Sequence, residues 1–176
     1  MPRIPLGASL LAAALFAVAL TGLAPRPEPP PTNGKPLFQG ARIDEQTLAL
    51  FQRACQNCHS ENTRWPWYSR IPPASWVIGN DVHAARRTVN FSNWPSYRPE
   101  EQEDLLTRIG TAARTGRMPL ARYTLLHREA ALALRERLQI YGWTRSEKKR
   151  LRAAEGGPTS VIGTPSGYSS LTQKRN

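Results

Sequence analysis

One short run of the chain combines two thiols with an imidazole: Cys55-Gln56-Asn57-Cys58-His59. Two thiols three positions apart at a helix end can each reach one vinyl group of the same porphyrin and form a thioether. The histidine that follows directly is then carried beneath the ring, where its imidazole binds the iron as proximal ligand. The run therefore predicts one covalent haem c, attached through Cys55 and Cys58 and ligated by His59.

Three other chemistries use paired cysteines and stay open as alternatives. A Cys-x-x-Cys redox pair is expected near a βαβ pattern, which the sequence lacks. A zinc site would need two histidines, but His83 and His127 lie far from the cysteines and do not have zinc-finger spacing. A simple disulfide between Cys55 and Cys58 suits an exported protein. Because the chain has only two cysteines, the sequence excludes a disulfide-stapled scaffold.

The sixth position on the iron has one thioether candidate, because Met118 is the only methionine besides Met1. It lies in a turn, directly before Pro119, and proline restricts the preceding residue to extended conformations. A methionine far downstream of the histidine suits His/Met coordination, which raises the reduction potential. The alternatives are that Met118 only fills the core, or that His127 or His83 is the sixth ligand.

Residues 62–76 form an aromatic, proline-rich segment with three Trp, one Tyr and three Pro. We expect this stiff segment to cover the porphyrin, with Arg64, Arg70 or an indole N–H contacting the haem propionates. The alternative is a small core packed with aromatic residues. We place three side chains in the wall of the haem pocket: Trp65, Trp67 and Tyr68.

The N-terminal residues predict export. Residues 6–24 are an apolar run long enough to cross a bilayer of about 30 Å, preceded by the single charge of Arg3. The run is either a cleaved signal or a retained anchor, and Pro25 directly after the small residues favours the anchor. The domain is then expected in the bacterial periplasm, held at the inner membrane if the run is uncleaved. Haem c is attached outside the cytoplasm, which agrees with this compartment.

Composition divides the chain into four parts. Residues 1–24 are the signal peptide or anchor, 25–37 a proline-rich linker, 38–143 the haem-binding domain, and 144–176 a basic tail expected to be disordered. Of the net charge of +11, +5 lies in that tail and only +4 in the domain, whereas a nucleic-acid binder concentrates charge on a folded face. We therefore expect no nucleic acid as partner, and a redox partner protein with an acidic surface.

Helical patterns dominate the expected domain. One helix is capped by Asp44 and ends at the cysteines, and a second is capped by Ser75. A third begins at Pro99 and stops near Gly116, and a fourth spans residues 126–141. No alternating run of β-branched residues appears. The sequence thus predicts an all-α, cytochrome c-like bundle of about four short helices around one covalent haem, behind an N-terminal signal or anchor helix.

The stretch 52–143 resembles a known family. The resemblance is carried by Cys-x-x-Cys-His and the residues after it, in particular Trp-Pro-Trp-Tyr-Ser at 65–69, and by Met118-Pro119 and 123–130. It is similar to the small bacterial haem-binding domain family, in which this run implies an exported helical domain with one covalent haem. The resemblance implies the same attachment thiols and proximal histidine, with Met118 as distal candidate. Arg128 stands where family members have proline.

These observations predict a monohaem c-type cytochrome that carries single electrons and is not an enzyme. Filled axial positions favour this activity, because no substrate need bind the iron. One alternative is a haem-based ligand sensor or peroxidase-type enzyme with an open sixth site, where His83 or His127 would supply the acid–base group. Another is a haem-bearing subunit of a larger membrane complex.

Overall fold

The computed structural model describes residues 11–12 and 34–155. The described part is all-helical and contains no strand, which confirms the predicted fold class. None of its helices combines the length and the apolarity needed to cross a bilayer. The predicted signal or anchor at 1–24 lies outside the described residues except for 11–12, as do most of the linker and residues 156–176.

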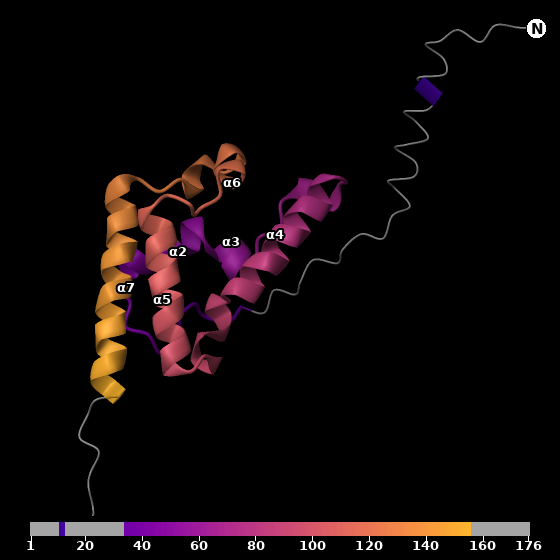
Figure 1. Cartoon of the computed structure of the whole chain (residues 1–176). Coiled ribbons are helices and arrows are strands. Elements are labelled where there is room, and N and C mark those ends of the chain that lie inside the picture. The colour runs from indigo at the N-terminus through magenta and orange to yellow at the C-terminus, as the bar shows by residue number, and fades with distance from the viewer. Residues whose placement is uncertain (1–10, 13–33, 156–176) are drawn as a thin grey trace, which may run out of the picture.

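The helices of the described part follow in this order: α2 (Glu45–Ala54), α3 (Gln56–His59), η1 (Trp67–Arg70), α4 (Ala74–Thr88), η2 (Phe91–Ser96), α5 (Pro99–Arg114), α6 (Ala121–Leu126), η3 (Arg128–Ala130) and α7 (Leu134–Glu155). Figure 1 shows α5 and α7 running side by side, with α4 inclined away from them. Helix α6 lies at the end of the molecule where α5 ends and α7 begins.

Two predicted helix starts are confirmed. Asp44 caps α2, because its carboxylate accepts hydrogen bonds from the Thr47 backbone N–H at 2.8 Å and the Thr47 hydroxyl at 2.7 Å. These bonds hold the pKa of Asp44 below its ordinary value. Helix α5 begins at Pro99, and Gly116 follows its end with φ of +70°, a conformation that glycine adopts without strain.

The predicted second helix needs a small correction. Helix α4 begins at Ala74, one residue before the expected cap, and Ser75 is a buried residue inside the first turn. Its backbone N–H donates to the carbonyl of Ile71 at 3.0 Å. The Trp76 N–H likewise donates to the Pro73 carbonyl at 3.1 Å, so these first N–H groups are satisfied without a serine cap.

The predicted fourth helix and the predicted tail are both corrected. The chain at 126–141 divides between the end of α6, η3 and the start of α7, and α7 then continues past Gly142 to Glu155. Trp143, Thr144 and Leu151 are buried within α7, so packing outweighs the weak helix propensity of the glycine. The domain end at Trp143 and the disorder predicted for residues 144–155 are therefore wrong.

An aromatic cluster fills the core beneath α2. The Phe38 ring lies 4.5 Å from Phe91, 5.1 Å from Trp94 and 5.0 Å from Trp143, measured between ring centroids. Phe51 of α2 packs edge-on against Trp143 at 5.2 Å. All five rings are buried, and each buries a large apolar area. The cluster fixes the helix that ends at the cysteines.

Helices α5 and α7 lie close together at Gly110. A Cβ added there would overlap the Thr144 hydroxyl and lie 3.2 Å from Cδ2 of Tyr141. We expect Gly110→Ala to lower the free energy of unfolding by about 1–3 kcal/mol, the usual cost of overpacking. Thr144→Ala in the same chain removes the overlapping oxygen and is expected to recover part of this loss in urea unfolding experiments.

Gly142→Ala is the matched control for this prediction. Gly142 is also inside a helix, but a Cβ added there meets no atom within 4 Å. The substitution is expected to stabilise the protein by about 0.5–1 kcal/mol, the difference in helix propensity. Equal effects of the two alanines would contradict the close approach at Gly110.

Candidate haem-binding site

The junction of α2 and α3 presents the two thiols and the imidazole together. Cys55 ends α2 and precedes the single turn of α3, which contains Cys58 and His59. The backbone N–H groups of Cys58 and His59 both donate to the Cys55 carbonyl, at 3.2 and 3.0 Å. This one helical turn brings the three side chains to a common space, as the spacing in the sequence predicts.

His59 is oriented for metal binding through Nε2. Its Nδ1 lies 3.2 Å from the Val89 carbonyl oxygen, which can only accept, so Nδ1 carries the proton of this contact. Burial lowers the pKa of His59, although hydrogen bonds to backbone carbonyls act in the opposite direction. The neutral ring therefore keeps its lone pair on Nε2, the arrangement found for histidine ligands. The ring also stacks on Phe91, with centroids 5.4 Å apart.

Both cysteines are free thiols in the structure. Burial raises the pKa of Cys55 to about 12, and the nearby Cys58 adds to the effect. Burial likewise raises the pKa of Cys58 to about 11, with a further contribution from the charge of Asp81. Both groups are protonated at neutral pH. This disfavours the redox-pair alternative, because an attacking cysteine needs a lowered pKa.

Two adjoining cavities lie beside these residues. The first, of about 610 Å³, is lined by both cysteines and by parts of α4 and α6, and we call it the thiol cavity. The second, of about 730 Å³, follows α5, and we call it the α5 cavity. Each volume falls within the range of about 300–1,000 Å³ that is common for ligand pockets. The two cavities share five lining residues: Cys55, His59, Thr88, Met118 and Leu120.

Met118 reaches this shared wall from the loop between α5 and α6. It is partly buried, and its backbone N–H donates to the Ala112 carbonyl at 3.3 Å. The structure thus brings Met118 and His59 to the same space, although 59 positions separate them in the chain. Two thiols, an imidazole and a thioether around largely apolar walls fit a covalent porphyrin with two axial ligands.

The other two histidines differ in their relation to the cavities. His83 is exposed on α4 and lines neither cavity. His127 lines the thiol cavity, where Nε2 lies 2.7 Å from the Tyr68 hydroxyl and Nδ1 lies 3.2 Å from a Glu129 oxygen. Its ring stacks on Tyr123 at 4.4 Å. Because both of its nitrogens already have partners, His127 would have to give up a hydrogen bond to bind iron. Within the described part, no group of three or more His, Cys, Asp or Glu side chains could hold a metal ion.

Comparison with known proteins gives one family match. The model of a haem-binding domain family matches residues 15–146, three quarters of the chain. This chain belongs to the haem-binding domain family. A protein named cytochrome c peroxidase Ccp, from Escherichia coli (strain K12), is 26% identical over 109 residues. That match covers 60% of this chain but only 23% of the relative. No solved structure matches the chain.

The aromatic segment of this haem-binding domain lies only partly in the cavity wall. Trp65 and Tyr68 line the thiol cavity, as predicted. Trp67 instead is 77% exposed and lines neither cavity, so its predicted place in the wall is wrong. In the tight turn of η1, consecutive side chains point to different sides, and only one of the two neighbours can face inward. Of the two predicted arginines, Arg64 lines the thiol cavity and Arg70 does not.

Three side-chain contacts that attach α6 over the thiol cavity were not predicted. Arg122 pairs with Asp81 of α4 through two contacts of 2.9 and 2.6 Å. The Asn57 amide donates to the Tyr123 hydroxyl at 2.8 Å. The third contact joins Tyr68 and His127, and all six side chains line the cavity. Tyr68 and His127 were already candidate site residues in the sequence, and Asn57 lies inside the cysteine motif, but nothing in the sequence marked the Asp81–Arg122 pair.

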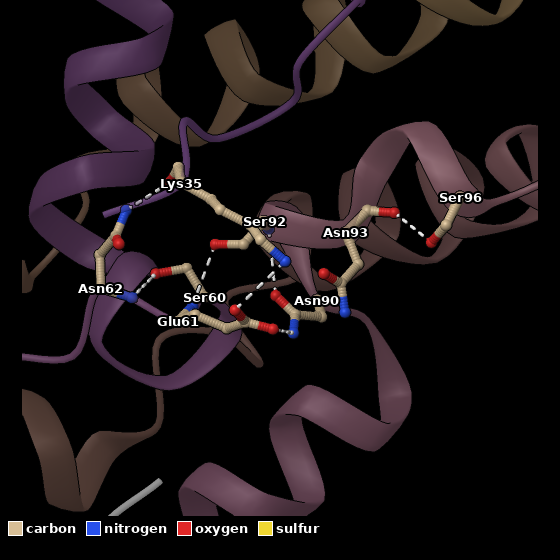
Figure 2. Close-up of polar contacts among 8 residues, drawn as sticks. All are labelled: Lys35, Ser60, Glu61, Asn62, Asn90, Ser92, Asn93 and Ser96. Atoms are coloured by element: carbon tan, nitrogen blue, oxygen red, sulfur yellow. Dashed lines mark hydrogen bonds and ion pairs between the residues drawn. The ribbon is translucent and has the colours of Figure 1, made fainter. Parts of the chain in front are cut away.

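A polar network supports the backbone that orients His59. Figure 2 shows the segment after the motif joined to the segment around Asn90. The Glu61 backbone N–H donates to the Ser92 hydroxyl at 3.0 Å, and the Asn90 amide donates to the Glu61 carboxylate at 3.2 Å. These bonds hold the chain beside Val89, whose carbonyl accepts from His59. The network is the kind of second layer that fixes the orientation of metal ligands.

Proposed function

We propose that this haem-binding domain carries one covalent haem c and passes single electrons, with His59 and Met118 as axial ligands. One observation carries the proposal: both cysteines, the imidazole and the thioether line one cavity. When bound, the haem would supply an iron that cycles between ferrous and ferric states. With both axial positions filled, the domain acts as a carrier and not as an enzyme.

The chain's own residues would hold the cofactor and tune its surroundings. Cys55 and Cys58 would bind it covalently, and the Val89 carbonyl fixes the ring of His59 through Nδ1. The thiol cavity has a largely apolar lining, and the polarity around a metal changes its reduction potential. The thioether of Met118 would favour the reduced state.

The proposed compartment and the proposed partner of the protein rest on features of its sequence. The apolar run at 6–24 supports a periplasmic location, tethered to the inner membrane if the run is retained. The net charge of +11 supports an acidic redox protein as partner, because complementary charge speeds the encounter. We propose no nucleic-acid partner.

A second candidate function is peroxidase-type chemistry at an open sixth site. Two observations favour it: the partial match to a protein named cytochrome c peroxidase, and the position of His127 in the thiol cavity beside the Tyr68 hydroxyl. A histidine with such a partner can move a proton. The two functions differ in whether Met118 binds the iron at its sixth coordination position.

The deciding experiment is a mass and a spectrum of the full chain, exported in a host that attaches haem c. We expect the mass of one covalent haem, a low-spin spectrum, and the weak red absorption band of methionine-ligated ferric haem. A high-spin reduced form that binds carbon monoxide at once would favour the second candidate. A protein with the mass of the polypeptide alone, without covalent haem, would contradict both candidate functions.

Met118→Ala tests the sixth ligand. We expect the red band to vanish and the reduction potential to fall by on the order of 0.1 V, within the range of about 0.8 V that axial ligands span. His83→Ala is the control, because this exposed side chain lines neither cavity and should leave the spectrum unchanged. If Met118→Ala has no effect and His127→Ala removes the low-spin signal, the ligand is His127.

A further inference from the structure

The loop that carries Met118 contacts Arg137 of α7 at Gly116. Gly116, two residues before Met118, has φ of +70°, and a Cβ added to it would lie 2.5 Å from Nη1 of Arg137 and 3.2 Å from its Cζ. The guanidinium is therefore packed directly on the backbone of Gly116. The positive φ favours glycine here, and any side chain at this position would also have to displace the guanidinium.

Arg137 is itself held in place. Its Nε donates to the Leu132 carbonyl at 2.9 Å, and its side chain is partly buried in the first turn of α7. The positive charge lies beside the end of α5, where the carbonyl ends of the helix favour a cation. Neither Arg137 nor Gly116 lines either cavity. Arg137 can therefore act on a ligand in the cavities only indirectly, through this loop or through Leu132, which lines the α5 cavity.

The rest of the loop depends on the same end of α5. Gly116 donates its backbone N–H to Ala113 at 3.0 Å, and Arg117 and Met118 donate theirs to the Ala112 carbonyl, at 3.0 and 3.3 Å. After Met118 the chain leaves α5 for α6. The turn at Gly116 therefore sets the direction in which Met118 enters the shared wall of the two cavities.

We propose that Arg137 is a positioning residue for Met118: its guanidinium clamps the Gly116 turn and so keeps the thioether in the shared wall. The inference rests on the proposed function, because it takes Met118 as the iron ligand. Loss of the clamp would raise the fraction of molecules in which Met118 has left its place. An added ligand that competes for the same position then binds more tightly, in proportion to that fraction.

Arg137→Met in the full-chain ferric holoprotein tests this inference, with imidazole as the competing ligand. We expect a weaker red band and an imidazole affinity raised about tenfold, which corresponds to the loss of about 1.4 kcal/mol of support for the Met118-bound state. Arg137→Lys keeps the charge but not the planar fork, so it is expected to give an intermediate affinity. If the Arg137→Met protein does not acquire covalent haem, the imidazole affinity of Arg137→Lys tests the proposal in its place.

Arg152→Met is the matched control. Arg152 also lies on α7 and pairs with α5, through Glu103 at 2.6 Å, but that contact is remote from Gly116. Its loss is expected to leave imidazole affinity within twofold of the wild type. Equal affinities in the Arg137 and Arg152 variants would overturn the role of Arg137. A wild type without the red band would instead overturn the His/Met proposal itself, so the two failures are distinguishable.

Discussion

The variant Cys55→Ala/Cys58→Ala is expected to leave the export pathway at the mass of the bare polypeptide, without covalent haem. Each thioether to the haem needs a cysteine sulfur, and Cys55 and Cys58 are the only cysteines in the chain. A single variant keeps one sulfur and is expected to attach haem through one bond, in lower yield. Mass spectrometry of denatured protein measures all three outcomes, because denaturation removes any haem that is not covalently bound.

Gln56→Ala is the control for this prediction. Gln56 lies inside the same motif, and its side chain donates only to the Asn62 carbonyl among the hydrogen bonds found, at 3.3 Å. It should retain full covalent haem. The haem-free double variant is further expected to melt at a lower temperature than the wild type, because a haem held in the cavities buries apolar surface in the folded state. Covalent haem in the double variant would contradict the assigned attachment.

Features fixed by neighbouring residues could be predicted from the sequence. The cap at Asp44 and the helix start at Pro99 each depend on the chemistry of one or two adjacent residues. The turn of α3 likewise carries Cys58 and His59 within a few positions of Cys55. These local signals place the motif at the end of a helix without any knowledge of the fold.

Features fixed by distant residues could not be predicted. The pair Asp81–Arg122 joins residues 41 positions apart, and neither has a spacing that marks it. The continuation of α7 past Gly142 depends on burial against α5, which outweighs local propensity. The choice between Trp67 and Tyr68 for the cavity wall depends on how η1 is rotated. The sequence thus predicts which thiols, imidazole and thioether line the candidate site, but not the contacts that close it.

A buried ion pair in α7 gives the largest expected effect on stability. The Glu147 side chain is 1% exposed, and Arg150 binds both of its oxygens, at 2.8 and 2.5 Å. The Arg42 backbone N–H also donates to it at 3.3 Å, which ties the chain before α2 to α7. The two partners are unequal, because the Arg150 side chain is 31% exposed and can reach water.

This inequality predicts an order among three variants. Arg150→Met leaves a buried carboxylate without its cation and is expected to lower the free energy of unfolding by about 3–5 kcal/mol. Glu147→Leu leaves only an arginine that can reach water, so its cost is expected to be smaller. The double variant replaces the pair with apolar groups of similar size and should be more stable than Arg150→Met, since such replacements are often near neutral. Urea unfolding of the holoprotein measures all three.

Arg152→Met is the control that separates the effect of a buried carboxylate on stability from the effect of losing one positive charge on α7. Its partner Glu103 is 14% exposed, where Glu147 is 1% exposed, and the Arg152 side chain is 64% exposed. An ion pair that water reaches contributes about 1 kcal/mol or less. The same loss of one positive charge on the same helix should therefore have a much smaller effect. If Arg150→Met and Arg152→Met cost the same, the stability of α7 does not depend on its buried carboxylate. A double variant no better than Arg150→Met would show that Glu147 is needed for its bond to Arg42 and not only as a partner for the arginine.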